Sequence, residues 1–477
     1  MILSIIGFVG CQSESSPPSP SKNLTIATSL PIGGLDPFTS RSGIGANIIE
    51  LLYRPLFRLD PNYHITPDFA REVYWEDSHK TNLIVQLNEN SAEDVMSSVE
   101  NARKKASGDL FEGLKNLEAI VVETSDRVRF SLKKYDRAFP VVMSQIPIVR
   151  FSGTQKETGE FRILNQSDAE VVLVRNVESI AKVNKIIFQV IPSSRRVMRE
   201  LVAENIDFIF FARESDFKVL TDIPGIRIDR IQSRILFQVL ENRKGAAKIS
   251  NLDWAALGRL INGQQLVGEV EDSVEYLSKF PVPKEDPWYP KEPEAAAEMA
   301  PPIFEATYED KTKRHLSFLG EQSRDRKVAR ILKRLFESMG VNLNLNDLSP
   351  EEFNKEIFID RKFDLALLPF NVKYTLVSNI LVFHSPSDVN SLNFSHYSNE
   401  LVDRFLDEAR YSLSDVEAKN YFSQAMYELS KDPPGIFLFW LKIPIVMREN
   451  CSGYRFDTNN EFFSSLKDVR CEPSAAN

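Results

Sequence analysis

The sequence contains few of the residues from which catalytic and metal sites are usually built. It has 5 histidines, 3 cysteines and 19 glycines among 477 residues. His384 and His396 lie twelve positions apart in a loop-rich stretch, and no other histidine or cysteine lies at the spacing of a metal-binding motif. We therefore interpret the histidines as surface or interface residues and predict no metal site.

Motifs of catalysis and nucleotide binding are also missing. Gly-x-Ser-x-Gly, Walker and Gly-x-Gly-x-x-Gly strings are absent, and 19 glycines is a low number for phosphate-binding loops in a chain of this length. Carboxylate pairs such as Glu241 and Asp253 occur, but nothing singles one out for acid–base chemistry. The sequence predicts a protein without a cofactor that is not an enzyme. A hydrolase stays an alternative, and it would need a clustered nucleophile and base.

The chain lacks an excess of positive charge. It carries 58 Lys and Arg against 67 Asp and Glu, a net charge of −9, whereas a surface that binds nucleic acid needs a basic excess. The basic residues between Arg324 and Arg334 recur at helical spacing, which is typical of a solvated helix face. Nucleic acid is therefore excluded as a partner. The length predicts two or three lobes, and 43% hydrophobic with 26% charged residues is ordinary for a globular protein.

Long hydrophobic runs are absent beyond the first residues. Residues 1–10 form a short apolar run that ends at Cys11, and a Ser- and Pro-rich stretch, residues 12–22, follows. This arrangement predicts a lipoprotein signal whose diacylated Cys11 anchors the protein to a membrane. A ragged N-terminus with a chance cysteine is the alternative, because Phe8 stands where such signals usually carry Leu and no basic residue precedes the run.

The remaining cysteines, Cys451 and Cys471, lie close together near the C-terminus. An even pair in an exported protein predicts a disulfide, which would stabilise the fold by roughly 3 kcal/mol through the entropy of the unfolded chain. Two unpaired thiols in a reducing compartment are the alternative.

Hydrophobic periodicity predicts a mixed α/β fold. We expect strands at residues 24–28, 82–87, 128–132, 170–174, 185–190, 206–211, 316–319, 341–345 and 363–368. We expect helices at residues 44–57, 193–205 and 324–339, two helices within 401–429, and apolar strands at 436–447 that Pro444 interrupts. Ser91 and Asp94 have the spacing of a helix capping box. The succession of strand, helix and strand at 185–211 predicts a crossover on a mixed sheet.

Seven prolines crowd into residues 280–302. No regular element tolerates that density, so we expect an exposed loop within or beside a second lobe. The elements that follow it form a second α/β unit.

Short strings across most of the chain resemble the extracellular solute-binding proteins of the peptide and nickel class, family 5. Residues 35–37 are Leu-Asp-Pro, and residues 52–57 are Leu-Tyr-Arg-Pro-Leu-Phe. Further echoes follow in the family's order at Asp60, residues 67–70, 94–95, 153–154, 159–161 and 383–385, Asn390, and residues 397–399, 402–403 and 432–433. Proteins of this class deliver substrates to ABC importers from the periplasm or from a lipid anchor.

The resemblance implies a periplasmic-binding-protein-like fold of the class II (cluster C) type, with two lobes of mixed sheets, an inserted small domain and a hinge cleft. After residues 1–22, lobe I would comprise residues 23–60, 161–234 and 447–477. The small domain would be residues 61–160, and lobe II residues 235–446.

Three departures from the family pattern bear on the ligand. Residues 88–90 stand in place of an aromatic-Asp-Gly turn, and residues 252–259 lack the usual Arg-Gln/Lys-Ala string. Residues 370–374, Phe-Asn-Val-Lys-Tyr, replace a Trp followed by an Asp-Tyr pair whose Asp holds the ammonium of a peptide. Lys373 reverses that charge, so it would repel an ammonium and attract a carboxylate or phosphate.

Two loops are predicted to line the ligand site, because ligands of open α/β sheets lie beyond the carboxyl ends of strands. The site residues we predict are Thr28, Ser29 and Leu30 after the first strand, and Phe370, Asn371, Lys373 and Tyr374 after the strand at 363–368. The alternative is that Lys373 is a solvated surface residue and the aromatic residues belong to the core.

The sequence thus predicts a monomeric lipoprotein of the cell envelope, facing the periplasm or the surface. It would capture a peptide-like or other small solute between its lobes and pass it to an ABC transporter permease. The alternative is an envelope interaction protein that keeps the fold but has no import function, in which side chains would fill the cleft.

Overall fold

The computed structural model describes residues 23–40, 43–60, 62–105, 112–177, 179–210, 219–245, 274–290, 312–320, 322–385, 392–456 and 462–472, with single positions between 254 and 270. The predicted signal and tether, including Cys11, lie outside the described residues. So do residues 252 and 253 and the part of the proline-rich stretch after residue 290.

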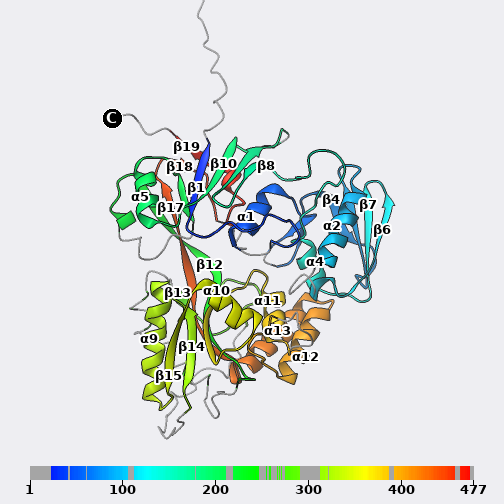
Figure 1. Ribbon diagram of the computed structural model, residues 1–477. Coiled ribbons are helices and arrows are strands. Elements are labelled where there is room, and N and C mark those ends of the chain that lie inside the picture. Colours follow the sequence, from blue (N-terminus) through cyan, green and yellow to red (C-terminus); the bar gives the residue numbers. More distant parts are fainter. Residues whose placement is uncertain are drawn as a thin grey trace, which may run out of the picture.

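Two long antiparallel strands connect the two halves of the molecule (Figure 1). They are β12 (Ile226–Glu241) and β17 (Gly435–Arg448), and they lie side by side within an eleven-stranded sheet of order β15-β14-β16-β12-β17-β11-β1-β10-β9-β8, with β13 also paired to β17. The other strands are β1 (Leu24–Thr28), β8 (Phe161–Gln166), β9 (Glu170–Arg175), β10 (Lys185–Val190), β11 (Phe208–Phe210), β13 (Val274–Leu277), β14 (Arg314–Leu319), β15 (Leu343–Leu348) and β16 (Leu365–Asn371).

The first lobe consists of β1 and β8–β11 with helices α1 (Gly43–Leu52) and α5 (Ser194–Val202). The predicted crossover is present, since β10 leads through α5 into β11. However, β10 and β11 are not neighbours, because β1 lies between them and pairs in parallel with both. Ser193 caps α5 by accepting a hydrogen bond from the backbone N–H of Arg196. Because β10, β1 and β11 are parallel, their carboxyl ends face the same way.

The small domain is a four-stranded antiparallel sheet, β4 (Ala70–Trp75), β5 (Asn82–Leu87), β7 (Arg127–Leu132) and β6 (Leu117–Thr124), with helices α2 (Ala92–Lys104) and α4 (Ala138–Met143). A two-stranded ladder of β2 (Phe57–Leu59) and β3 (Ile65–Pro67) precedes it. The predicted capping box is wrong. Ser91 is the N-cap of α2 but makes no side-chain capping bond, and Asp94 instead accepts a hydrogen bond from the backbone N–H of Phe151 at 2.9 Å.

The second lobe consists of β13–β16 with helices α9 (Ser323–Ser338), α10 (Pro350–Phe353), α11 (Thr375–Phe383), α12 (Glu400–Tyr411) and α13 (Asp415–Lys431). A π-helical segment, Asn354–Ile359, continues α10. Helix α9 buries Val328, Leu332 and Phe336 toward the sheet, as its amphipathic pattern predicts. The parallel pairs β14–β15 and β14–β16 make this unit α/β.

The expectation for the proline-rich stretch is wrong for its described part, residues 280–290. Phe280, Val282 and Trp288 are buried there, and so is Asp286. The Trp288 ring meets the ring of Phe422 on α13 edge to face, with centroids 5.6 Å apart. Prolines prevented a regular element, but the irregular segment carries enough apolar side chains to join the core.

Pro444 does not interrupt β17, contrary to the sequence-based expectation. It lies opposite Arg230 within a continuous ladder to β12. On the other side of β17 the described pairing to β13 ends at Leu441, and that to β11 begins at Ile445. Pro444 therefore occupies a stretch with a partner strand on one side among the described residues, the edge-like setting in which a strand tolerates proline.

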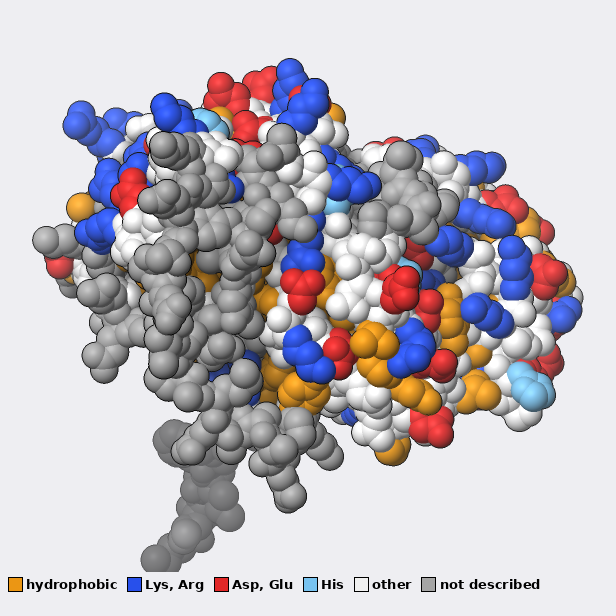
Figure 2. Space-filling view, turned by 90° about the horizontal axis from the view of Figure 1, so that it is seen from below, with side chains coloured by type: hydrophobic (Ala, Val, Ile, Leu, Met, Phe, Trp, Pro, Cys, Tyr) orange, Lys and Arg blue, Asp and Glu red, His pale blue; other side chains and the backbone are white. Residues whose placement is uncertain are grey.

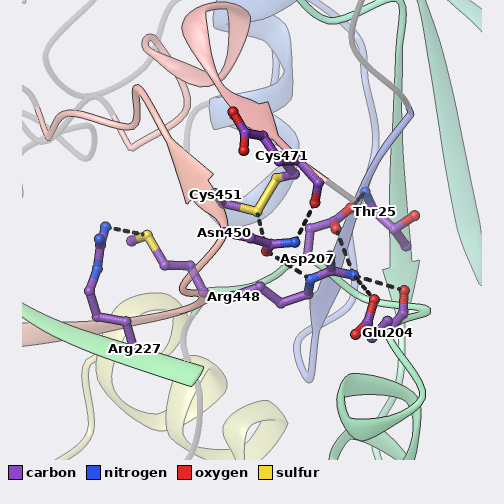
Figure 3. Close-up of a disulfide and its surroundings, with 10 residues drawn as sticks. Thr25, Glu204, Asp207, Arg227, Arg448, Asn450, Cys451 and Cys471 are labelled. Atoms are coloured by element: carbon purple, nitrogen blue, oxygen red, sulfur yellow. Dashed lines mark hydrogen bonds and ion pairs between the residues drawn. A yellow bond between two sulfur atoms is a disulfide. The ribbon is translucent and has the colours of Figure 1, made fainter. Parts of the chain in front are cut away.

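The C-terminal segment returns to the first lobe through a two-stranded ladder, β18 (Cys451–Ser452) with β19 (Arg470–Cys471). Cys451 and Cys471 are joined by a disulfide with an S–S distance of 2.02 Å (Figure 3). Asp207 lies beside it, accepts a hydrogen bond from the backbone N–H of Thr25, and contacts the guanidinium of Arg448. Bonded sulfurs are not thiolate ligands, so this group of sulfurs and carboxylate is structural.

Candidate functional site

The strand register brings the ends of β1 and β16 to face each other across the middle of β12. Strand β1 runs in the same direction as β12, and β16 runs opposite to it. Through β11 and β17, the end of β1 is level with Asp229 of β12, whereas Asn371 at the end of β16 is level with Ile235. Six regular strand residues would span about 20 Å, and the register shift of β12 between Gln232 and Leu236 makes the separation shorter. Both carboxyl ends therefore point into the region between the lobes.

The first predicted loop is held tightly at its start. Thr28 is 1% exposed, and its hydroxyl accepts a hydrogen bond from the backbone N–H of Leu30 at 3.1 Å. Its carbonyl accepts a bond from the backbone N–H of Ile191 at 2.8 Å. Ser29 is half-buried, whereas Leu30 is exposed. The Thr28 hydroxyl thus shapes the loop, and Ser29 and Leu30 present the more accessible surface.

The second predicted loop begins inside the sheet. Phe370 and Asn371 still belong to β16 and pair with Leu236 and Ile235 of β12. The Phe370 ring lies edge-on to Phe383, with centroids 6.4 Å apart. Asn371 is exposed. Of the residues in this string, Phe370 therefore contributes partly to the core, as the alternative interpretation expected of the aromatic residues.

Lys373 lies next to a carboxylate of the opposite lobe. Its Nζ is 3.6 Å from Oε1 of Glu50 on α1, and the two side chains are 26% and 27% exposed. Glu50 was not among the predicted residues, because nothing in a helix of the first lobe signals that it will meet a loop of the second. The site accordingly contains one positive and one negative side chain.

Tyr374, which follows this ion pair in the chain, contacts Ser144 and Tyr63 of the small domain. Tyr374 is 7% exposed, its hydroxyl lies 3.3 Å from the Ser144 hydroxyl, and its ring centroid is 6.1 Å from that of Tyr63. The Tyr63 hydroxyl accepts a hydrogen bond from the backbone N–H of Leu376 at 3.0 Å. Burial is the main cause that raises the pKa of Tyr63, so it stays a neutral hydroxyl. These contacts join the small domain to the second lobe.

A buried ion pair fixes the backbone of the Lys373 loop. The Arg234 guanidinium, on β12, pairs with Asp286 and donates from Nε to the carbonyl of Val372 at 2.8 Å. The Thr375 hydroxyl donates to Asp286 at 2.6 Å. Arg234 therefore links the hinge strand to the loop. Sequence reasoning missed this group because Asp286 lies in the stretch that was expected to be an exposed loop.

A carboxyl group with a shifted pKa lies where β13 meets β17. Burial is the main cause that raises the pKa of Glu275 to about 7, repulsion from Glu285 adds to it, and Lys442 opposes it. Its Oε1 is buried without a hydrogen-bond partner among the described residues. Next to it, the Tyr276 hydroxyl donates to Glu285 at 3.1 Å. This group borders the β12–β17 crossing.

Seen from the second lobe, the molecule shows Lys and Arg interspersed with Asp and Glu (Figure 2). No single sign dominates the described part of that face.

The predicted site residues thus fall into two groups that lie on opposing strand ends, with Lys373 and Tyr374 making contacts to the first lobe and the small domain. Ligand contact by any of the seven remains a prediction. The hinge residue Arg234, the partner Glu50 and the aromatic Tyr63 are additions that the structure makes to the candidate site.

A model of the family described as "Bacterial extracellular solute-binding proteins, family 5 Middle" matches residues 67–390. No curated protein sequence matches the chain.

Solved structures of similar fold span nearly the whole chain. The oligopeptide-binding protein AppA from Bacillus subtilis, in complex with a nonapeptide, has 14% identity and a TM-score of 0.76, covering 95% of this chain and 99% of AppA. NikZ from Campylobacter jejuni, in complex with Ni(L-His), has 16% identity and a TM-score of 0.77, covering 94% of this chain and 100% of NikZ. DppA from Helicobacter pylori, in complex with a peptide, has 16% identity and a TM-score of 0.76, covering 95% of this chain and 98% of DppA. These likenesses confirm the predicted two-lobed fold.

Proposed function

Because the chain belongs to the bacterial extracellular solute-binding proteins of family 5, as its sequence motifs predicted, we propose that it captures a peptide-like or other small solute between its lobes for an ABC importer. The partner that receives the solute is the importer's permease. The similar structures are those of binding proteins for peptides or a nickel complex rather than of enzymes.

The observation that carries this proposal is that the carboxyl ends of β1 and β16 face each other along β12 and β17. A ligand in this region touches loops of both lobes, and β12 and β17 are the elements that connect those lobes in the central sheet. Binding therefore favours the closed arrangement, because a ligand stabilises whichever arrangement gives it contacts from both sides.

The Glu50–Lys373 pair supports a zwitterionic ligand. A ligand with both an ammonium and a carboxylate replaces each half of the pair with an equivalent charge, so neither side chain is left uncompensated. A purely anionic ligand must compete with Glu50 for Lys373. We therefore favour a peptide-like solute whose carboxylate meets Lys373, in contrast to the family pattern in which an Asp at this point holds the ammonium.

Two measurements test this function. Mass spectrometry of small molecules released from the purified protein by denaturation should identify a bound zwitterionic solute. Small-angle scattering with that solute should then show a smaller radius of gyration than without it, because the lobes close. A radius that is unchanged at saturating ligand would contradict capture between lobes.

We further propose that Cys11 carries the lipid that holds the protein at the membrane. No helix among the described residues is long and apolar enough to cross a bilayer. Metabolic labelling with a fatty-acid probe should tag the native chain and not Cys11→Ser. Labelling that survives this substitution would exclude Cys11 as the anchor.

The second candidate function is an envelope interaction protein that uses the same fold without import. The packing of Tyr63, Tyr374 and Trp288 between the small domain and the second lobe favours it, because side chains occupy space there. This candidate predicts no released solute and the same radius of gyration under all ligand conditions, so the measurements above distinguish the two functions.

A further inference from the structure

A pocket lies where the small domain meets helix α13, and it involves none of the seven predicted site residues, although Tyr63 borders it. Its volume is about 230 Å³, and its walls include Tyr63, Trp75, Tyr135, Arg137 and Asp415. The volume is below the roughly 300–1,000 Å³ of pockets for drug-sized ligands, so it suits a fragment-sized molecule.

Aromatic rings form one side of this pocket. Trp75 of β4 and Tyr135 meet edge to face, with ring centroids 5.8 Å apart. Both rings are half-buried, so part of each ring surface remains accessible. Such walls favour a flat apolar group, because aromatic pairs gain from offset or edge-to-face contact.

Positive charge gathers around the same ring. Lys80 Nζ lies 5.4 Å and the Arg137 guanidinium carbon 5.7 Å from the Tyr135 ring centroid. Lys80 makes no ion pair within the described part of the chain. Among the described lining residues Asp415 carries the negative charge, and it pairs with Arg137. The pocket therefore has a net positive charge that an anion would balance.

The described residues use only part of the hydrogen-bonding capacity of Arg137. Its side chain is 8% exposed, Nη1 pairs with Asp415 at 2.6 Å, and Nε donates to the carbonyl of Ser412 at 3.0 Å. Its Nη2 is buried and has no hydrogen-bond partner among the described residues. A buried donor without a partner is costly, so a carboxylate at this position would be bound with favourable energy.

From these features we propose that this pocket binds the carboxylate of a small aromatic acid. The ring would lie against Trp75 and Tyr135, and the carboxylate would meet Lys80 and Nη2 of Arg137. Because Arg137 also holds Ser412 and Asp415 at the start of α13, the bound acid would contact the small domain and the second lobe together. This site goes beyond the proposed solute site and does not depend on it.

Benzoate, benzamide and benzylamine test the proposal, since they share a ring and differ in charge. Titration calorimetry or ligand-observed NMR with the full chain should show benzoate binding at millimolar concentration. Benzamide should bind about tenfold more weakly, the scale of losing a charge-assisted hydrogen bond, and benzylamine not at all. Equal binding of benzoate and benzamide would overturn the proposal, as would no binding of benzoate at about 10 mM, a generous limit for a fragment.

Variants locate the site. Lys80→Gln should weaken benzoate binding about fivefold, since one of two cations is lost. Its matched control, Lys104→Gln, removes an exposed lysine of the same domain outside the pocket and should leave binding unchanged. Arg137→Gln should weaken benzoate binding further. Trp75→Leu should weaken benzoate binding without changing the charge of the pocket, so it tests the site even if Arg137→Gln does not fold.

Two outcomes would show that benzoate does not bind in this pocket. Benzoate affinity that is unchanged in both Lys80→Gln and Trp75→Leu would exclude this pocket. Affinity lost in Lys373→Gln but retained in those variants would place benzoate in the region between the lobes, which supports the proposed solute site and contradicts the second one.

Discussion

Lys373 and Glu50 form an ion pair that joins the two lobes, with Nζ 3.6 Å from Oε1. Lys373 follows β16 of the second lobe, and Glu50 lies on α1 of the first. The pair is therefore made only when the lobes are close together. It also places opposite charges at the point where the carboxyl ends of β1 and β16 face each other.

Lys373→Glu should weaken binding of a solute carboxylate by roughly 1 to 3 kcal/mol, the scale of losing a charge-assisted hydrogen bond. The new carboxylate also repels Glu50, so the closed arrangement becomes less favourable. Calorimetry with the solute identified by mass spectrometry measures the change. The double variant Lys373→Glu with Glu50→Lys is the control, because it restores the pair with reversed polarity. Unchanged affinity in the single variant, with the fold intact, would remove Lys373 from the site.

Glu275→Gln should stabilise the protein at about pH 8 and have little effect at about pH 4. The pKa of Glu275 is raised to about 7 in the folded state, so folding favours its neutral form, and stability is lost as the pH rises from the unfolded value toward that pKa. Because the side chain is only half-buried, solvent screening reduces the gain to roughly 1 kcal/mol. Denaturant unfolding at both pH values tests this.

The control for that experiment is Glu72→Gln, which changes an exposed glutamate of β4. Its effect should be equally small at both pH values. An equal gain from Glu275→Gln at low and high pH would show that its charge is not responsible.

Asp136→Asn should destabilise the protein by about 3 to 5 kcal/mol, since it leaves a buried arginine without its main partner. Asp136 is 0% exposed and lies 2.7 Å from Nη2 of Arg410, whose side chain is 4% exposed and which also pairs with Glu112. Asp415→Asn breaks a comparable contact to Arg137, but Asp415 is 62% exposed, so its loss should cost about 1 kcal/mol or less. Similar losses in the two variants would contradict the role of burial.

Replacing Cys451 and Cys471 by serine should lower the free energy of unfolding by roughly 3 kcal/mol, since the bond closes a short loop in the unfolded chain. Unfolding in denaturant, with and without reductant, provides the measurement. Wild-type protein should lose stability on reduction, whereas the double variant should not respond to the reductant. Alkylation of both residues in unreduced protein from the envelope would show that they are free thiols.

Local hydrophobic patterns predicted most elements of the fold. Residues 24–28 alternate and form β1 at those bounds, and the amphipathic stretch at 324–339 became α9. The errors occurred where tertiary packing overrode local rules. The helix expected to reach residue 57 ends at Leu52, shortly before Pro55. Strand β17 passes through Pro444, where the described residues provide a partner strand on one side.

The candidate site was less predictable, because its contacts join segments far apart in sequence. Strand-end reasoning located Lys373 and Tyr374, but Glu50 lies more than 300 positions from Lys373, and neither residue indicates the other. Asp286 was not predicted because it lies in the proline-rich stretch, and only the fold shows that it pairs with Arg234. Charge pairs of this kind require the register of β12, which a single sequence does not provide.

The position of β17 in the central sheet determines when the chain can fold. This strand, residues 435–448, lies between β12 and β11, so it connects the first lobe's strands to those of the second. Until residues 435–448 have been synthesised, the strands of the two lobes cannot be joined into the central sheet. Early segments therefore remain without their final partner while the chain emerges, and native folding follows synthesis and export instead of proceeding lobe by lobe.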